Sequence, residues 1–285
     1  MMNNAAIMSF PSDLASFWWA LGLATVLGAC VGSLLTRLIH RLPLMMEEEW
    51  ASQAREGDGA ESAPARLRLF TPRDHCPHCR ATLQWRDTVP VLSGLLLRGR
   101  CRHCAAPVGL HYPIVELMTA AAFGLCVWRF GLTWPALYAM VLAAALIALG
   151  WIDARTNLLP DIVTLPLIWL GLLVNLNGTF APLPQAVLGA VCGYGFLWLV
   201  FHAFRAITGR EGMGYGDFKL LAALGAWLGL AMVPWLLLAA SLTGVVVGLS
   251  LMFIGRAARG QALPFGPYLA VAGLLGLWLT DGAWW

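Results

Sequence analysis

Long apolar runs separated by short polar connections make up most of the 285-residue chain. A transmembrane helix needs about 20 predominantly apolar residues. The boundary between the sixth and seventh runs depends on Pro234, and a single kinked helix is the alternative there. The pattern predicts an all-α polytopic membrane protein with about eight transmembrane helices, at residues 14–37, 114–131, 133–152, 161–177, 183–204, 217–232, 233–254 and 265–283.

The composition agrees with a membrane protein. Hydrophobic residues make up 59% of the chain and charged residues 12%, whereas about a quarter of the residues are charged in an ordinary soluble domain. No Lys or Arg precedes the first apolar run, which favours a retained helix over a cleaved signal peptide. No basic tract is interleaved with aromatic residues, so the sequence indicates no nucleic-acid partner.

The basic residues predict an orientation in the membrane. If eight helices alternate in direction, all but one of the 18 Lys and Arg residues fall on one side, which the positive-inside rule identifies as the cytoplasm. The exception is Arg129. Both termini are then periplasmic. The predicted parts are a first transmembrane helix at 1–38, a cytoplasmic loop domain at 39–113 and a membrane-embedded core at 114–285, with a polar insertion at 45–65 whose glutamates can form a helix.

Four of the seven cysteines form two C-x2-C pairs inside the predicted cytoplasmic loop, Cys76 with Cys79 and Cys101 with Cys104. Two such pairs complete a tetrahedral thiolate shell around a metal ion. A reducing compartment disfavours disulfides, although a redox dithiol or two disulfides is the alternative interpretation. Four thiolates leave no open position for water, so we expect a structural zinc ion.

Two aspartates stand out as candidate catalytic residues. Asp153 closes an apolar run, where a carboxylate faces the negative end of the helix dipole, and Asp217 opens another run behind Gly212, Gly214 and Gly216. Both are predicted at the cytoplasmic face. Two close carboxylates share a proton, which gives one base to activate water and one acid to protonate a leaving amine. The helix dipoles favour Asp217 as the base, and swapped roles or a shared proton also fit.

Two further acids and the glycines are weaker candidates. Asp161 follows Pro160 and is well explained as a helix cap, and capping is also the simplest explanation of Asp217. Capping does not require the glycines, which permit a close backbone approach or a sharp bend. Glu116 lies just inside the second run, and acids within a membrane are functional candidates.

In residue identity, order and spacing, these motifs resemble those of the bacterial type IV prepilin leader peptidases that are also N-methyltransferases. The G-x-G-D motif alone is similar to the wider class of intramembrane aspartyl proteases. One small departure is Thr36, where many family members carry Asn. The resemblance covers nearly the whole chain and rests on "GSLLTRLIHRLP", the cysteine pairs, "RGRCRHC", "HYPIVELMTA", "WIDARTNLLPD", "GMGYGDFKLLAALGAWLG" and "PFGPYLAVAG".

The resemblance implies an activity. The catalytic pair falls on Asp153 and Asp217, with Gly214, Gly216, Glu116 and Asp161 as supporting positions, and the cysteines match a zinc-type cluster. The enzyme would cleave the leader of type IV prepilins or pseudopilins at the cytoplasmic face of the bacterial inner membrane. It would then methylate the new N-terminal residue with S-adenosylmethionine. The alternatives are a peptidase without methyltransferase activity, a transporter with a zinc-stabilised cytoplasmic domain, and a structural subunit of a secretion or pilus machine.

Overall fold

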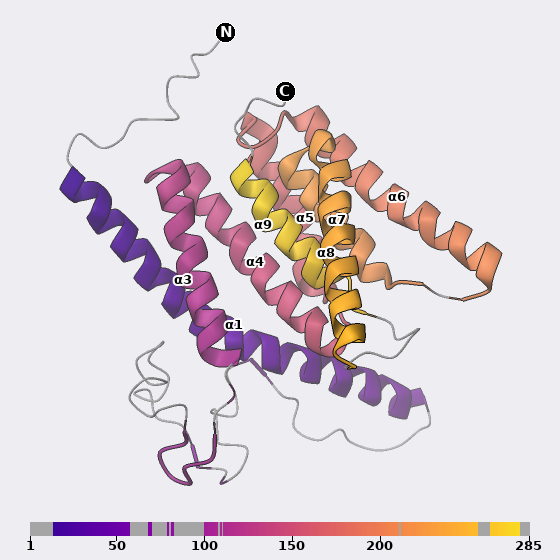
Figure 1. The fold of residues 1–285 in the computed structure, drawn as a ribbon, viewed down its shortest axis with the longest axis horizontal. Helices are drawn as coiled ribbons and strands as arrows, with labels where there is room; N and C mark the ends of the chain where they lie inside the picture. Colours follow the sequence, from indigo (N-terminus) through magenta and orange to yellow (C-terminus); the bar gives the residue numbers. More distant parts are fainter. Residues whose placement is uncertain are drawn as a thin grey trace. The chain divides into compact units, whose positions relative to one another are not determined.

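A computed structural model describes residues 14–57, 68–69, 79, 81–82, 100–107, 109, 111–210, 212–255 and 263–279. Most of these residues are helical, and an isolated β-bridge joins Arg100 to Pro107. Each of the eight predicted apolar runs contains a helix. The helices are α1 (Leu14–Gly57), α3 (His111–Phe130), α4 (Trp134–Thr156), α5 (Asp161–Val174), α6 (Leu183–Thr208), α7 (Tyr215–Leu228), α8 (Val233–Phe253) and α9 (Gly266–Leu279) (Figure 1).

Helix length divides these elements into two classes. In the described part of the chain, five helical segments are long and apolar enough to cross a membrane, and they correspond to α1, α3, α4, α6 and α8. The helices α5, α7 and α9 have 14 residues each, which is about 21 Å at 1.5 Å per residue. The chain is therefore an all-α membrane protein in which long and short helices are combined.

The residues group into two compact units, Met1–Ala136 and Leu137–Trp285. In the first unit, α1 packs against α3 through Gly28 and Gly32, which form a G-x-x-x-G motif. A Cβ atom on Gly28 would lie 2.7 Å from the Thr119 carbonyl oxygen, and one on Gly32 would lie 2.7 Å from Glu116 Cα. Small residues at this spacing let two membrane helices approach closely.

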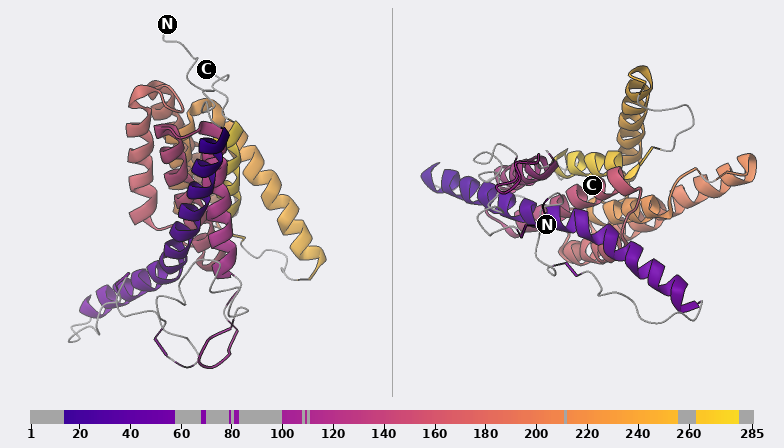
Figure 2. Two further views of the ribbon diagram at one scale, coloured as in Figure 1. Left: turned by 90° about the vertical axis from the view of Figure 1, so that its left-hand side faces the viewer. Right: turned by 90° about the horizontal axis from the view of Figure 1, so that it is seen from below.

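The helix α1 extends further than its apolar run. The first transmembrane helix was expected to end at residue 38, but α1 continues through the glutamates of the polar insertion to Gly57. Figures 1 and 2 show that α1 changes direction along its length. Pro43 lies inside the helix and cannot donate the backbone hydrogen bond of its turn, which is a common cause of such a bend.

In the second unit, α7 is the central helix. All of its residues from Leu220 to Leu228 are buried, and it packs against α5, α6 and α9. Gly189 of α6 and Gly225 of α7 face each other so closely that a Cβ on either would lie within 2.5 Å of the other's carbonyl oxygen. The C-terminal parts of α6 and α8 extend away from the other helices of this unit (Figure 2).

The structure separates α7 from α8. Gly229 has φ +82°, a conformation that favours glycine, and it ends α7. A short 3-10 turn, Leu230–Met232, follows, and Pro234 lies in the first turn of α8, where proline is well tolerated. The alternative of one kinked helix over residues 217–254 is therefore wrong.

One buried amide fixes the far ends of α5 and α7. Asn175 is fully buried, and its Nδ2 donates to the carbonyl oxygens of Ala226 and Trp227, both at 2.9 Å. Its Oδ1 accepts hydrogen bonds from the backbone N–H groups of Phe180 and Ala181. This single side chain thus connects the end of α5, the following loop and the end of α7.

Candidate active site

Asp153 lies one turn before the end of α4 and is held by the first residue of α9. Its side chain is buried, with 4% of its surface exposed. The backbone N–H of Gly266 donates a hydrogen bond of 2.9 Å to Asp153 Oδ2. The helix dipole of α4 alone would disfavour a carboxylate at this position, but the positive N-terminal end of α9 faces it and offsets that effect.

Asp217 lies in the first turn of α7 and is also buried, with 6% of its surface exposed. The N-cap residue of this helix is Gly214, which has no side chain that could cap it. Among the described residues, no group donates a hydrogen bond to Asp217 Oδ1. The carboxylate does interact with the backbone of Gly214, the N-cap residue, as an acid at the third helical position does in a capping box. Capping therefore explains that contact and leaves Oδ1 without a partner in the described part of the chain.

The fold brings these two aspartates together. The Asp153 carboxylate is close enough to repel a negative charge on Asp217. Both groups are shielded from water, which strengthens their interaction. Because their negative charges repel, the pair favours a state in which only one of the two carboxyl groups is ionised. A carboxylate and a carboxylic acid side by side are the groups needed to remove a proton from water and to supply one to a leaving amine.

The glycines before Asp217 differ in what they do. A Cβ on Gly216 would lie 2.6 Å from Leu159 Cβ, so only glycine lets the loop after α4 pack on the start of α7. A Cβ on Gly214 would meet nothing closer than 4.0 Å. The close approach expected for this motif is therefore found at Gly216 and not at Gly214.

Asp161 has a role other than the expected cap. It is the first residue of α5, Pro160 occupies the N-cap position, and no side chain caps this helix. The Asp161 carboxylate instead accepts two hydrogen bonds from Lys219 Nζ, at 2.6 and 2.7 Å. This ion pair connects the starts of α5 and α7. The capping prediction for Asp161 is wrong because the proline before it takes the cap position.

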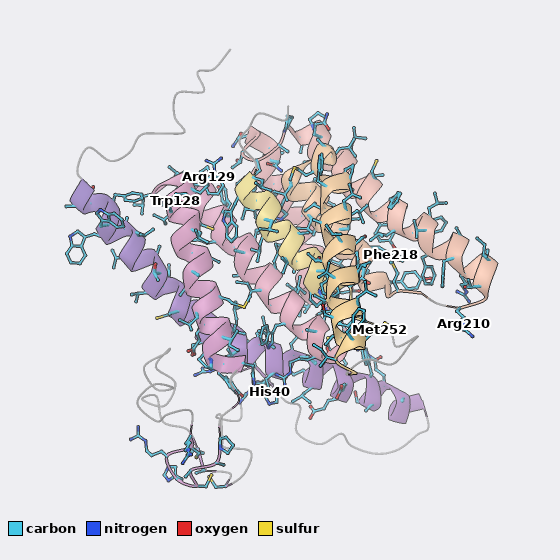
Figure 3. The ribbon with its side chains drawn as sticks, in the orientation of Figure 1. His40, Trp128, Arg129, Arg210, Phe218 and Met252 are labelled. Atoms are coloured by element: carbon cyan, nitrogen blue, oxygen red, sulfur yellow. The ribbon has the colours of Figure 1, made fainter. Side chains whose placement is uncertain are left out.

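Aromatic rings pack against the start of α7, and nothing in the sequence pattern predicts these contacts. Phe218, the residue after Asp217, is fully buried and makes edge-on contacts with Tyr194 and Phe201 of α6. Tyr215 packs against both Phe201 and Phe218. Figure 3 shows Phe218 on α7. These contacts fix the first turn of α7, on which Asp217 lies.

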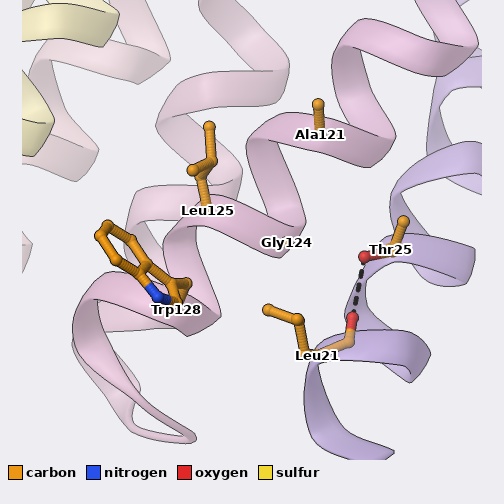
Figure 4. A pocket seen from close by; sticks show the side chains of 6 residues that line it. All are labelled: Leu21, Thr25, Ala121, Gly124, Leu125 and Trp128. Carbon is orange, nitrogen blue, oxygen red and sulfur yellow. Dashed lines mark hydrogen bonds between the residues drawn. The ribbon is translucent and has the colours of Figure 1, made fainter. Parts of the chain in front are cut away.

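Glu116 belongs to the first unit. It lies on α3 with 9% of its surface exposed, and its backbone packs against Gly32 of α1. The same pair of helices lines an open cavity of about 520 Å³ (Figure 4). None of the side chains that line this cavity is ionisable, so its wall offers no acid or base; the lining residues are Leu21, Thr25, Ala121, Gly124, Leu125 and Trp128.

Three of the four predicted metal ligands lie together. The Sγ atoms of Cys79, Cys101 and Cys104 are within 4.8 Å of one another, and those of Cys79 and Cys101 are 4.0 Å apart. Cys76 lies outside the described residues. Cys101 and Cys104 share a tight turn, in which the N–H of Ala105 donates to the Cys101 carbonyl oxygen at 2.9 Å. This cluster can hold a metal ion.

Comparison with known proteins places the chain in a family. The family model described as Bacterial Peptidase A24 N-terminal domain matches residues 26–130, and that of the Type IV leader peptidase family matches residues 140–249. A protein of Burkholderia pseudomallei strain 1026b named prepilin leader peptidase/N-methyltransferase is 49% identical, over 94% of this chain and 87% of its own length. The chain belongs to the prepilin leader peptidase/N-methyltransferase family.

Further members of the family have similar coverage. The relative from Pseudomonas aeruginosa is 47% identical over 94% of this chain and 93% of its own, and that from Neisseria gonorrhoeae is 45% identical over 97% and 96%. Comparison with solved structures found no match. Both aspartates fall within the leader peptidase match at 140–249, whereas Gly266, which contacts one of them, lies beyond it.

Proposed function

We propose that the chain cleaves the leader peptides of type IV prepilins or pseudopilins, with Asp153 and Asp217 as the catalytic pair, and then methylates the new N-terminus. The observation that carries the proposal is the pair of buried carboxylates, brought close enough to repel each other from the ends of α4 and α7. Family membership supports the reaction class, because the relatives are named for peptidase and N-methyltransferase activities.

The chemistry of the pair suits peptide hydrolysis. The carboxylate removes a proton from a water molecule, whose oxygen attacks the carbonyl carbon of the scissile bond. The protonated carboxyl group gives its proton to the leaving nitrogen as the C–N bond breaks. No covalent acyl-enzyme forms, because the nucleophile is water. A transporter or a structural subunit is not favoured, since neither requires two repelling carboxylates at adjoining helix ends.

The methylation step uses a methyl donor that the resemblance identifies as S-adenosylmethionine. Its transfer to the new amino terminus is part of the proposal, and it distinguishes this enzyme from a peptidase without methyltransferase activity. A labelled methyl donor incubated with enzyme and prepilin checks this step. Label on the processed product is the expected result, whereas cleaved but unlabelled product would favour the peptidase-only alternative.

We propose that the cysteine cluster holds a structural zinc ion, with Cys76 as the fourth ligand. Zinc–sulfur bonds of about 2.3 Å in a tetrahedron separate neighbouring sulfurs by roughly 3.8 Å, and the 4.0 Å between Cys79 and Cys101 fits that spacing. Zinc analysis of purified protein tests this. Cys101→Ser should lose the metal while Cys192→Ser, on α6, keeps it. Zinc retained at full level by Cys101→Ser would contradict the proposed site.

The catalytic pair is tested by prepilin cleavage with detergent-solubilised enzyme. We expect Asp153→Asn and Asp217→Asn each to lower kcat at least about 100-fold, the smallest typical contribution of acid–base catalysis. Asp161→Asn is the matched control, because it removes a carboxylate from the neighbouring helix start. An exposed ion pair contributes about 0–1 kcal/mol, so this variant should retain activity within about fivefold. Near wild-type cleavage by Asp153→Asn or Asp217→Asn would contradict the proposed catalytic pair.

A further inference from the structure

The N-terminus of α9 holds Asp153 through one backbone hydrogen bond. The N–H of Gly266, the first residue of α9, donates to Asp153 Oδ2 at 2.9 Å, and the bond is buried. The two residues are 113 positions apart in the sequence. A hydrogen bond to a carboxylate is stronger than one between neutral groups. This hydrogen bond restrains the rotation of the carboxylate. The other carboxylate oxygen, Oδ1, is then the one that is not bonded to the α9 backbone.

Glycine is required for this contact. A Cβ on residue 266 would lie 2.6 Å from Asp153 Oδ2 and 2.9 Å from Asp153 Cγ. Any side chain there would displace the carboxylate or the start of α9. The φ angle of Gly266 is not the reason, because the positive φ values among the described glycines lie elsewhere. The carboxylate itself occupies the space that a side chain would need.

A second glycine brings the two helices together. Gly150 lies on α4 three residues before Asp153, and a Cβ there would lie 3.0 Å from Ala270 Cβ and 3.6 Å from Pro267 Cα. Both contacts are with the first turns of α9. Gly150 therefore lets α9 approach α4 closely enough for the Gly266 N–H to reach Asp153. The close approach of α9 to α4 therefore depends on a contact that involves no atom of the Asp153 carboxylate.

We infer that Gly266 is a positioning residue for the peptidase reaction: its N–H fixes the Asp153 carboxylate so that Oδ1 is directed to water and substrate. This inference rests on the proposed catalytic role of Asp153. A positioning residue changes the rate of the chemical step and leaves substrate affinity unchanged. Misplacing a catalytic group by about 1 Å can lower a rate about 100-fold.

The first test compares prepilin cleavage kinetics of Gly266→Ala with those of Gly276→Ala. Both substitutions add a methyl group to α9, but the one at residue 276 meets side-chain ends of Leu228, Leu236 and Met232 at 3.1–3.3 Å. We expect Gly266→Ala to lower kcat about 100-fold with KM unchanged, and Gly276→Ala to retain most of the wild-type kcat. An unchanged kcat in folded Gly266→Ala overturns the inference. A lower kcat/KM that results from a raised KM also overturns it.

The second test alters the approach of α9 without adding an atom beside the carboxylate. Gly150→Ala should lower kcat, and adding Ala270→Gly should restore it, because the second change removes the Cβ that the first one meets. These two variants test the positioning role of Gly266 even if Gly266→Ala does not fold. A kcat unchanged by Gly150→Ala, or not restored in the double variant, overturns the inference.

These results are separable from those that test the catalytic pair. If Asp153→Asn remains active, the proposed role of Asp153 fails and the inference about Gly266 falls with it. If Asp153→Asn is inactive while Gly266→Ala and Gly150→Ala cleave normally, the catalytic pair stands and the positioning role alone is wrong.

Discussion

Solvent exposure separates the proposed catalytic aspartates from a third aspartate at the same end of the second unit. The residues Asp153 and Asp217 have 4% and 6% of their surface exposed, whereas the side chain of Asp161 has 55%. A buried carboxylate interacts strongly with its neighbours because little water screens it. The ion pair between Asp161 and Lys219 is largely solvated, so it contributes to the connection between two helices and little to the stability of the fold.

Gly216 should be the glycine of its motif that tolerates substitution least. Gly216→Ala places a Cβ 2.6 Å from Leu159 Cβ, and overpacking of this kind costs about 1–3 kcal/mol. We expect lower thermal stability together with slower prepilin cleavage, because relief of the contact shifts the first turn of α7 and Asp217 with it. Thermal unfolding in detergent and cleavage rates at matched folded yield measure the two effects.

Two further variants test whether packing against Leu159 is the reason for that result. Gly214→Ala should unfold at nearly the wild-type temperature, since a Cβ there enters open space. Adding Leu159→Gly to Gly216→Ala removes the atom that the new methyl group meets and should restore part of the lost cleavage rate. If Gly214→Ala proves the more damaging of the two single substitutions, packing against Leu159 is not what this motif provides.

The sequence alone predicted the two aspartates but not the residue that holds one of them. Asp153 and Asp217 are recognisable because acids beside apolar runs are rare and costly. Gly266 lies within the stretch "PFGPYLAVAG" that contributes to the resemblance, but it carries no functional group and its contact with Asp153 spans 113 positions, so the sequence did not reveal its role. The expected cap at Asp161 was wrong because Pro160 takes the N-cap position, and the actual partner, Lys219, lies 58 residues away.

At the scale of elements, apolar runs predicted where helices lie but not how long they are. Hydropathy identified α5, α7 and α9 as spans, although each has 14 residues. A local feature ends α7, because Gly229 adopts a positive φ, whereas a residue with tertiary hydrogen bonds, Asn175, follows α5. The four hydrogen bonds of Asn175 depend on groups from two other segments, and a single sequence gives no sign of them.

Asn175 should be among the most sensitive polar residues for stability. Asn175→Ala removes four hydrogen bonds from a fully buried side chain, which at about 0.5–1.5 kcal/mol each amounts to roughly 2–6 kcal/mol. We expect a clear fall in the thermal unfolding temperature in detergent. Asn177→Ala, two residues further on and exposed, is the control. Equal unfolding temperatures for the two variants would show that the buried amide is not a stabilising connection.

For the whole molecule, the helix ends of the second unit agree with the distribution of basic residues. The contacts of Asp153 with Gly266 and of Asp161 with Lys219 bring the end of α4 together with the starts of α5, α7 and α9. Arg155 and Lys219 lie at this same end. The helices α5, α7 and α9 therefore lead away from the end that the positive-inside rule assigns to the cytoplasm, as alternating spans require.

The shortness of α5 makes its crossing the decisive test of topology. With the 3-10 turn it extends over Asp161–Asn177, about 25 Å at 1.5 Å per residue, whereas the hydrocarbon core is about 30 Å thick.

Two sandwich fusions of alkaline phosphatase, which is active only after export, test whether α5 crosses the membrane. If α5 crosses, the fusion at Gly178 is active and the fusion at Arg210, at the end of α6 (Figure 3), is inactive. The reverse pattern would mean that α5 does not span, and it would place Arg205 and Arg210 outside against the positive-inside rule. We expect the first pattern, because a modest local thinning of the bilayer costs less than exporting two arginines.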